Sequence, residues 1–167
     1  MKRKFHLPLL FSLCLTLLLF LAACGEPGPL TQEGLDNLNC HPRDLPKNQT
    51  YNPIEGRQHS LDIFLGGAPT LVSTLAYNDI SSTRQSFSCT IFAFADETTA
   101  QKGFESACDE LQPPFRFPAI GDQACRDGEQ EVNLIFRKGT YIVWLWVDYK
   151  GVGIEDTANR ILDRLSR

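Results

Sequence analysis

The amino terminus of this chain carries the pattern that most restricts what the chain can fold into. Three basic residues among the first four precede an apolar stretch from Leu7 to Leu21, in which the only polar residues are Ser12 and Thr16. A stretch of this length suits the apolar region of a secretory signal peptide and falls short of the roughly 20 residues of a membrane-spanning helix. The pattern therefore predicts a segment that directs export, is then removed, and contributes nothing to the folded domain.

The apolar stretch ends in Leu21-Ala22-Ala23-Cys24. This sequence resembles the lipobox of bacterial lipoproteins, in which a Leu and two small residues precede a Cys. The resemblance implies cleavage after Ala23, a thioether from the Cys24 sulfur to diacylglycerol, and acylation of the new amino terminus. The acyl chains would anchor the protein to a membrane on the extracytoplasmic side of the cell envelope. The alternative is an ordinary secretory signal peptide, because small residues also precede ordinary cleavage sites.

We expect three segments: a signal peptide over residues 1–23, a lipidated flexible tether over 24–37, and a single extracytoplasmic domain over 38–167. The tether prediction rests on the three glycines and two prolines between Gly25 and Asn37. After the signal peptide, no stretch approaches 18 consecutive apolar residues, so we expect no second membrane segment.

The charge of the exported chain excludes one class of partner. Loss of the signal peptide leaves 13 Lys and Arg residues against 20 Asp and Glu residues, which is a net charge of −7. An acidic chain without a basic cluster lacks the cations that nucleic-acid binding requires. We therefore expect no nucleic-acid partner, and instead the membrane through the lipid on Cys24 and an unknown envelope protein or small ligand.

Four cysteines remain after Cys14 leaves with the signal peptide and Cys24 is lipidated: Cys40, Cys89, Cys108 and Cys125. In an exported domain this even number predicts two disulfides, with three connectivities that the sequence alone does not separate. We favour Cys40 with Cys89 and Cys108 with Cys125, because the second pair would join the end of a helix to the strand that follows. No two of them have a C-x₂₋₄-C spacing and the remaining histidines stand alone, so we expect no metal site and no cofactor.

Hydrophobic periodicity predicts an α+β domain with a mainly antiparallel sheet of about five strands and two helices packed on one face. The expected strands are Leu61 to Leu65, Thr70 to Tyr77, Ser86 to Ala95, Glu131 to Arg137 and Thr140 to Asp148. The expected helices follow an N-cap at Asp96 and run from about Glu155 to Ser166. The Pro-rich stretch from His41 to Arg57 is expected to be irregular and to lie on the surface of the domain.

The last two strands are expected to form a hairpin around Lys138-Gly139. In that register Leu134 lies opposite Val143 on an apolar core face, and the other face carries Trp144 and Trp146.

The order of elements and three short motifs suggest a wider resemblance. The motifs are Phe94 to Glu105, Ile120 to Ala124 and Leu134 to Val143. Over about Ser60 to Leu165, the chain resembles small extracytoplasmic lipoprotein domains of unassigned function and, distantly, PsbP-like and kinase sensor-domain sandwiches. Because these motifs are structural, the resemblance implies a fold and a compartment and transfers no catalytic residue.

No common catalytic motif occurs in the sequence, so we expect the protein not to be an enzyme. The expected site is a shallow aromatic surface in which Trp144 and Trp146 join Phe92 or Phe94, because exposed aromatic clusters mark contact sites. The alternative is that the stretch from His41 to Arg57 covers these rings. The sequence thus favours a non-enzymatic module that binds a ligand or partner, with a cell-envelope enzyme or enzyme inhibitor and a structural envelope protein as alternatives.

Overall fold

The structure is a computed structural model that describes residues 30–45, 50–54, 67–79, 86–111, 115–117, 120–127, 132–147 and 154–167. The chain divides into two compact units, Met1–Leu30 and Thr31–Arg167. The predicted signal peptide and Cys24 lie outside the described residues. The fold below is that of the second unit.

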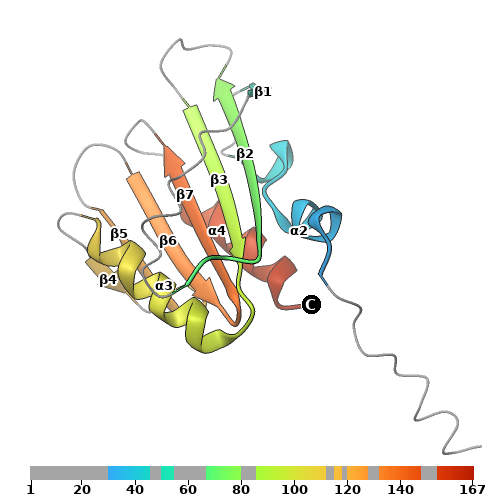
Figure 1. The fold of residues 1–167 in the computed structure, drawn as a ribbon. Coiled ribbons are helices and arrows are strands. Elements are labelled where there is room, and N and C mark those ends of the chain that lie inside the picture. Colours follow the sequence, from blue (N-terminus) through green and yellow to red (C-terminus); the bar gives the residue numbers. More distant parts are fainter. Residues whose placement is uncertain are drawn as a thin grey trace, which may run out of the picture. The chain divides into compact units, whose positions relative to one another are not determined.

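A single antiparallel sheet forms the centre of this unit (Figure 1). Its strands, as far as the structure describes them, are β1 (Tyr51–Ile54), β2 (Leu71–Asp79), β3 (Ser86–Ala93), β4 (Phe115–Phe117), β5 (Gln123–Arg126), β6 (Val132–Lys138) and β7 (Tyr141–Val147). They lie in the order β1-β2-β3-β7-β6-β5-β4, and every neighbouring pair is antiparallel. The predicted fold class is confirmed, but seven strands replace the five expected. The predicted strand from Leu61 to Leu65 lies outside the described residues.

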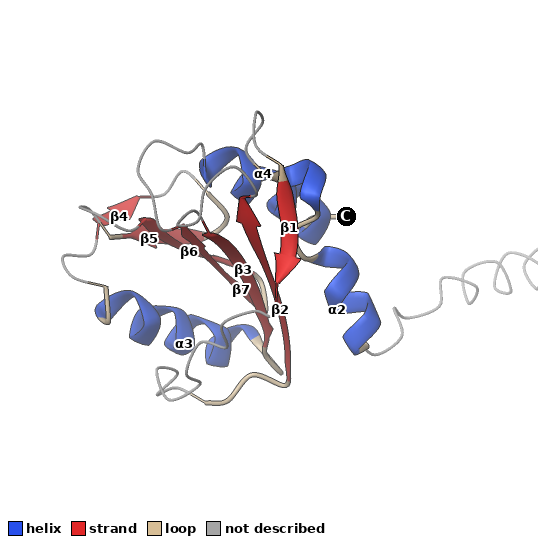
Figure 2. Cartoon of the chain, turned by 90° about the horizontal axis from the view of Figure 1, so that it is seen from above, coloured by secondary structure: helices blue, strands red, loops and turns tan. Residues whose placement is uncertain are grey.

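Helices pack against both faces of the sheet, where the prediction had two helices on one face (Figure 2). Helix α3 (Glu97–Asp109) covers one face, and α4 (Ile154–Leu165) and α2 (Gln32–Leu38) lie on the other. A short 3₁₀ helix, η1 (Pro42–Asp44), follows α2. Asp96 caps α3 as predicted, because its side chain accepts a hydrogen bond from the Thr99 N–H.

Two apolar cores result, one on each side of the sheet. Strand residues whose side chains point toward α4 form the larger core with Leu35 of α2 and Ile154, Ala158 and Ile161 of α4. Residues of the opposite parity form the smaller core with Phe104 and other side chains of α3. Because side chains alternate along a strand, one sheet contributes to both cores.

The β6–β7 hairpin differs from its predicted register by two residues. Lys138 pairs with Tyr141, so the turn is Gly139-Thr140, and Leu134 lies opposite Leu145 rather than Val143. The turn begins at Gly139, whose φ of 56° favours glycine. A shift of two residues preserves the face on which each side chain lies, so the predicted assignment of residues to faces is confirmed.

The predicted tether of residues 24–37 is too long at its carboxyl end. Thr31 caps α2 by accepting a hydrogen bond from the Gly34 N–H, and Leu35 is fully buried in the larger core. One buried leucine in seven residues is too weak a periodic signal to identify a helix from sequence. The folded unit therefore begins by Thr31.

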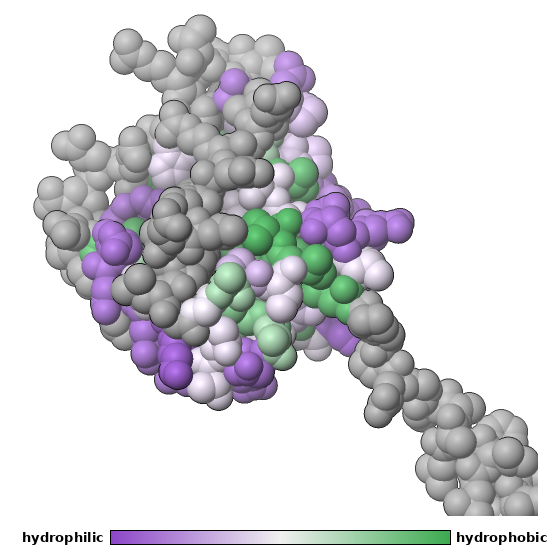
Figure 3. Space-filling model, in the orientation of Figure 1, coloured by the Kyte–Doolittle hydropathy of each residue, from purple (hydrophilic) through white to green (hydrophobic). Residues whose placement is uncertain are grey.

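On the face shown in Figure 3, the described surface carries both polar and apolar side chains. Apolar side chains gather on the face shown in that view over β2 and beside α2. Leu71 and Val72, at the start of β2, are half-buried. Among the large apolar residues of the described part, Leu30 alone is exposed, with 36% of its surface accessible to solvent. Within the same part, no helix combines the length and apolar content that a membrane span requires.

Candidate functional site

The predicted aromatic surface is buried, which corrects the expectation from sequence. Phe92, Phe94 and Trp144 are 0%, 5% and 8% exposed, and they belong to the core beneath α3. The prediction failed because strand periodicity identifies a face but not the element that covers it. The alternative cover is also wrong where the structure tests it, because Leu45 and Tyr51 from the His41 to Arg57 stretch pack in the opposite core.

Trp146 is the one predicted aromatic residue that remains partly exposed. It lies in a row of paired residues that crosses four strands, Ala76–Ser88–Trp146–Asn133, which we call the Ser88 row. The Ser88 side chain is buried, and among the described residues its Oγ has no hydrogen-bond partner. A buried hydroxyl without a hydrogen-bond partner costs free energy. Among the described residues, Ser88 has the one buried side-chain oxygen that lacks such a partner.

A short chain of hydrogen bonds fixes the other end of this row. The Trp144 Nε1–H donates to Asn133 Oδ1 at 2.9 Å, and the Asn133 amide donates to the Asp127 carboxylate. The backbone N–H of Asn133 also donates to Asp127, at 2.8 Å. Trp144 is thus held by its ring nitrogen as well as by packing, which gives it a structural role.

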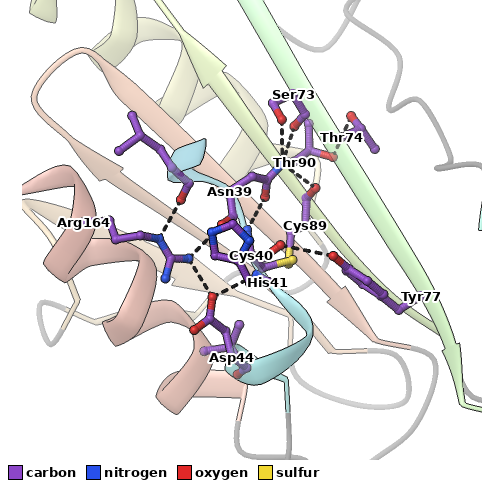
Figure 4. Close-up of a disulfide and its surroundings, with 12 residues drawn as sticks. Asn39, Cys40, His41, Asp44, Ser73, Thr74, Tyr77, Cys89, Thr90 and Arg164 are labelled. Carbon is purple, nitrogen blue, oxygen red and sulfur yellow. Dashed lines mark hydrogen bonds and ion pairs between the residues drawn. A yellow bond between two sulfur atoms is a disulfide. The ribbon is translucent and has the colours of Figure 1, made fainter. Parts of the chain in front are cut away.

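A second polar cluster surrounds the disulfide between Cys40 and Cys89 (Figure 4). Together, the disulfide and the polar cluster fix the segment Thr31–Leu45 to the sheet and to α4. We call this segment the arm. Both sulfur-bearing residues are fully buried and their Cα atoms are 6.2 Å apart, within the usual range for disulfides. The Tyr77 hydroxyl donates to the Cys40 carbonyl at 3.2 Å. The arm is therefore joined covalently to β3, in the middle of the sheet.

Asn39 connects the arm to β2. Its amide nitrogen donates to the backbone and side-chain oxygens of Ser73 at 3.0 and 2.9 Å, and its Oδ1 accepts from the Cys40 N–H at 2.8 Å. The Asn39 side chain is fully buried, so these bonds satisfy polar groups that water does not reach.

Asp44 and Arg164 connect the arm to α4. The Arg164 guanidinium lies 2.8 Å from Asp44 Oδ2 and also donates to the carbonyls of Leu38 and Asn39 at 3.1 and 2.8 Å. Burial raises the pKa of Asp44, but the hydrogen bond from the His41 N–H and the charge of Arg164 outweigh it, so that the pKa lies below its usual value. A buried, paired carboxylate of this kind is a structural group.

The second disulfide joins Cys108 in the last turn of α3 to Cys125 in β5. Both residues are fully buried, in the core beneath α3. The structure therefore has the connectivity that the sequence favoured. All four cysteines are bonded to each other, and none of them is available as a nucleophile or a metal ligand.

The arm cluster was not identified from sequence. Asn39 and Asp44 lie in polar stretches without a motif, and Arg164 is more than 120 residues away from the carbonyls that it contacts. Only the pairing of Cys40 with Cys89 indicated that the arm meets the sheet. Within the described ranges, no group of three or more His, Cys, Asp or Glu side chains could hold a metal ion.

Comparison with known proteins assigns no family. No protein-family model matches the sequence, and no curated protein matches it.

Proposed function

We propose that the protein is a lipid-anchored module of the cell envelope that binds a ligand or a partner outside the cytoplasm. The observation that carries this proposal is the pair of fully buried disulfides in a domain whose first helix begins at Gln32, shortly after the lipobox Cys24. Disulfides persist in oxidising compartments and are rare in the cytosol. The signal-like amino terminus and the cysteine chemistry of the domain thus support the same compartment.

Mass spectrometry of protein from the native host tests the anchor. We expect a mature chain that begins at Cys24 and carries a diacylglyceryl group and an amide-linked acyl chain. Substitution Cys24→Ala removes the only thiol at the cleavage site, so the variant should neither incorporate radiolabelled palmitate nor float with membranes. The matched control is Cys14→Ala, which changes a cysteine inside the predicted signal peptide and should leave acylation intact. An uncleaved, unmodified amino terminus in the native protein would contradict the proposal.

We propose that the Ser88 row carries the contact with the ligand or partner. Partial exposure of Trp146 supports this choice over the predicted aromatic surface beneath α3, whose rings are buried. A tryptophan ring offers a large contact area to a partner. No catalytic group is part of this proposal.

Chemical cross-linking in intact cells, followed by capture of the protein, tests this contact. We expect Trp146→Ala to reduce the yield of a specific cross-linked partner about tenfold, the loss that about 1.4 kcal/mol of binding energy gives. Asp163→Asn is the control, because Asp163 is exposed on α4, which packs against the opposite face of the sheet. Equal yields from both variants, with unchanged circular dichroism, would contradict the proposed contact.

A further inference from the structure

The lipid anchor and the folded unit are separated by very little chain. Helix α2 is capped at Thr31, so only seven Cα–Cα steps join Cys24 to the domain. Seven fully extended residues span at most about 25 Å, and a flexible segment of that length averages about 15 Å. A domain of about 140 residues has a diameter of about 35 Å. The reach of the tether is therefore smaller than the domain that it holds.

The attachment point lies at one end of the sheet. The Gln32 amide, in the first turn of α2, donates to the Val72 carbonyl near the start of β2 at 2.9 Å. Leu71 pairs with Ala93, Ala93 pairs with Tyr141, and Tyr141 begins β7 after the hairpin turn. We call this end of the sheet, where these three strand ends meet the hairpin turn, the hairpin end. The amino terminus of α3 is at the same end, because Phe94, just before it, donates its N–H to the Thr140 carbonyl.

We infer that the hairpin end rests against the lipid bilayer and that the opposite end of the sheet points away from it. This inference rests on the proposed lipidation of Cys24. The short tether keeps Thr31 close to the bilayer. The half-buried side chains at the hairpin end are Leu71 and Tyr141 on one face of the sheet and Val72, whose carbonyl binds Gln32, on the other. Apolar and tyrosine side chains are suited to the interface between lipid and water.

The charge at this end indicates which kind of lipid surface it contacts. Glu33, Asp96 and Glu97 are exposed in or next to the first turns of α2 and α3. The two cations of the hairpin, Arg137 and Lys138, are both ion-paired with Asp122. These carboxylates oppose attraction to anionic headgroups, so the contact does not depend on anionic lipid. A vesicle of phosphatidylcholine alone is therefore the appropriate probe.

The Ser88 row lies toward the other end of the sheet. Ala76 of this row is four residues beyond Val72 on β2, and Asn78 at the end of that strand pairs with Asn52 of β1. Six residues of strand from Val72 to Asn78 span about 20 Å. In the inferred orientation, the Ser88 row lies at the end of the sheet that is farther from the lipid. A partner that binds it would therefore not need to contact the bilayer.

Energy transfer from the domain to the bilayer tests the orientation. The full lipidated chain is reconstituted in phosphatidylcholine vesicles that contain rhodamine-labelled lipid, and a fluorescein donor is attached to a single introduced cysteine. Glu33→Cys and Asn52→Cys are the two donor sites, because both residues are exposed and they lie at opposite ends of the sheet. We expect about twice the transfer from the site at Glu33, because the two sites differ by about 20 Å in height.

A longer tether and a flotation assay separate the possible outcomes. Insertion of about 30 Gly and Ser residues after Gly25 extends the mean reach to about 35 Å and should make the two transfer efficiencies similar. Equal transfer from both sites in the original chain, with the protein still floating with vesicles, would overturn the orientation and leave the anchor intact. Protein that does not float at all would instead overturn the proposed lipidation, and the orientation with it.

Discussion

At the scale of single residues, the ionisation of Asp44 makes the stability of the folded domain depend on pH. Its folded-state pKa is lowered, so the unfolded chain binds the proton more readily than the folded one. The stabilisation that this group provides is complete above the unfolded-state pKa near 3.8 and is lost as the pH falls through the folded-state value. We expect the free energy of unfolding in urea to decrease below about pH 4, and Asp44→Asn to remove part of that decrease.

The matched control for this experiment is Asp163→Asn, an exposed position on α4. The unfolding free energy of this variant should change with pH in the same way as that of the unmodified protein. If Asp44→Asn and Asp163→Asn give the same profile, the ion pair with Arg164 does not stabilise the domain. Far-ultraviolet circular dichroism at neutral pH checks that both variants are folded.

Individual site residues were the least predictable part of the molecule. The sequence assigned Trp144 to the correct face of the sheet, but α3 covers that face and buries the ring to 8% exposure. A helix that packs over strands distant in sequence leaves no periodic signal in those strands. Asn39 and Arg164 were missed for the same reason, because their partners come together only when the arm meets the sheet and α4.

At the scale of elements, the two disulfides should contribute unequally to stability. Cys40 and Cys89 are 49 residues apart, whereas Cys108 and Cys125 are 17 apart. In the chain-entropy model, a cross-link of the longer loop constrains the unfolded chain more, by about 1 kcal/mol. We expect the double variant Cys40→Ala/Cys89→Ala to lose about 4 kcal/mol and Cys108→Ala/Cys125→Ala about 3 kcal/mol of unfolding free energy.

Urea denaturation of the two double variants measures this difference. They are matched controls for each other, since all four side chains are fully buried and each change leaves a cavity of similar chemistry. A larger loss from the Cys108–Cys125 pair would show that packing beneath α3, rather than loop length, decides the contribution of each bridge.

Elements with strong periodic signals were predicted well, and their ends and partners were not. The sequence identified β3, α3 and α4 within a few residues, because each carries a long apolar pattern and α3 also has an N-cap at Asp96. It placed the β6–β7 turn one residue too early, since Lys138-Gly139 and Gly139-Thr140 both place a glycine in a two-residue turn. Helix α2 was missed because Leu35 is its one fully buried side chain.

At the scale of the whole molecule, hydrophobic periodicity predicted an α+β domain and the cysteine count predicted two disulfides, and the structure agrees with both. They did not predict that helices would cover both faces, because the pattern of a helix shows its own apolar side and not the side of the sheet that it meets. For this reason, three of the four residues of the expected binding surface lie in the core beneath α3. Of the four aromatic residues predicted to form that surface, Trp146 alone is partly exposed and is not a member of the core beneath α3.

The two bridges join cysteines that are consecutive in the sequence after Cys24, Cys40 to Cys89 and Cys108 to Cys125. A chain that crosses a membrane amino end first would expose these thiols in the order in which they pair, so oxidation on emergence gives the native bonds without later exchange. An unmodified Cys24 thiol would emerge before Cys40 and could react with it first. Conversion of that sulfur to a thioether would therefore anchor the chain and also protect the order of its oxidation.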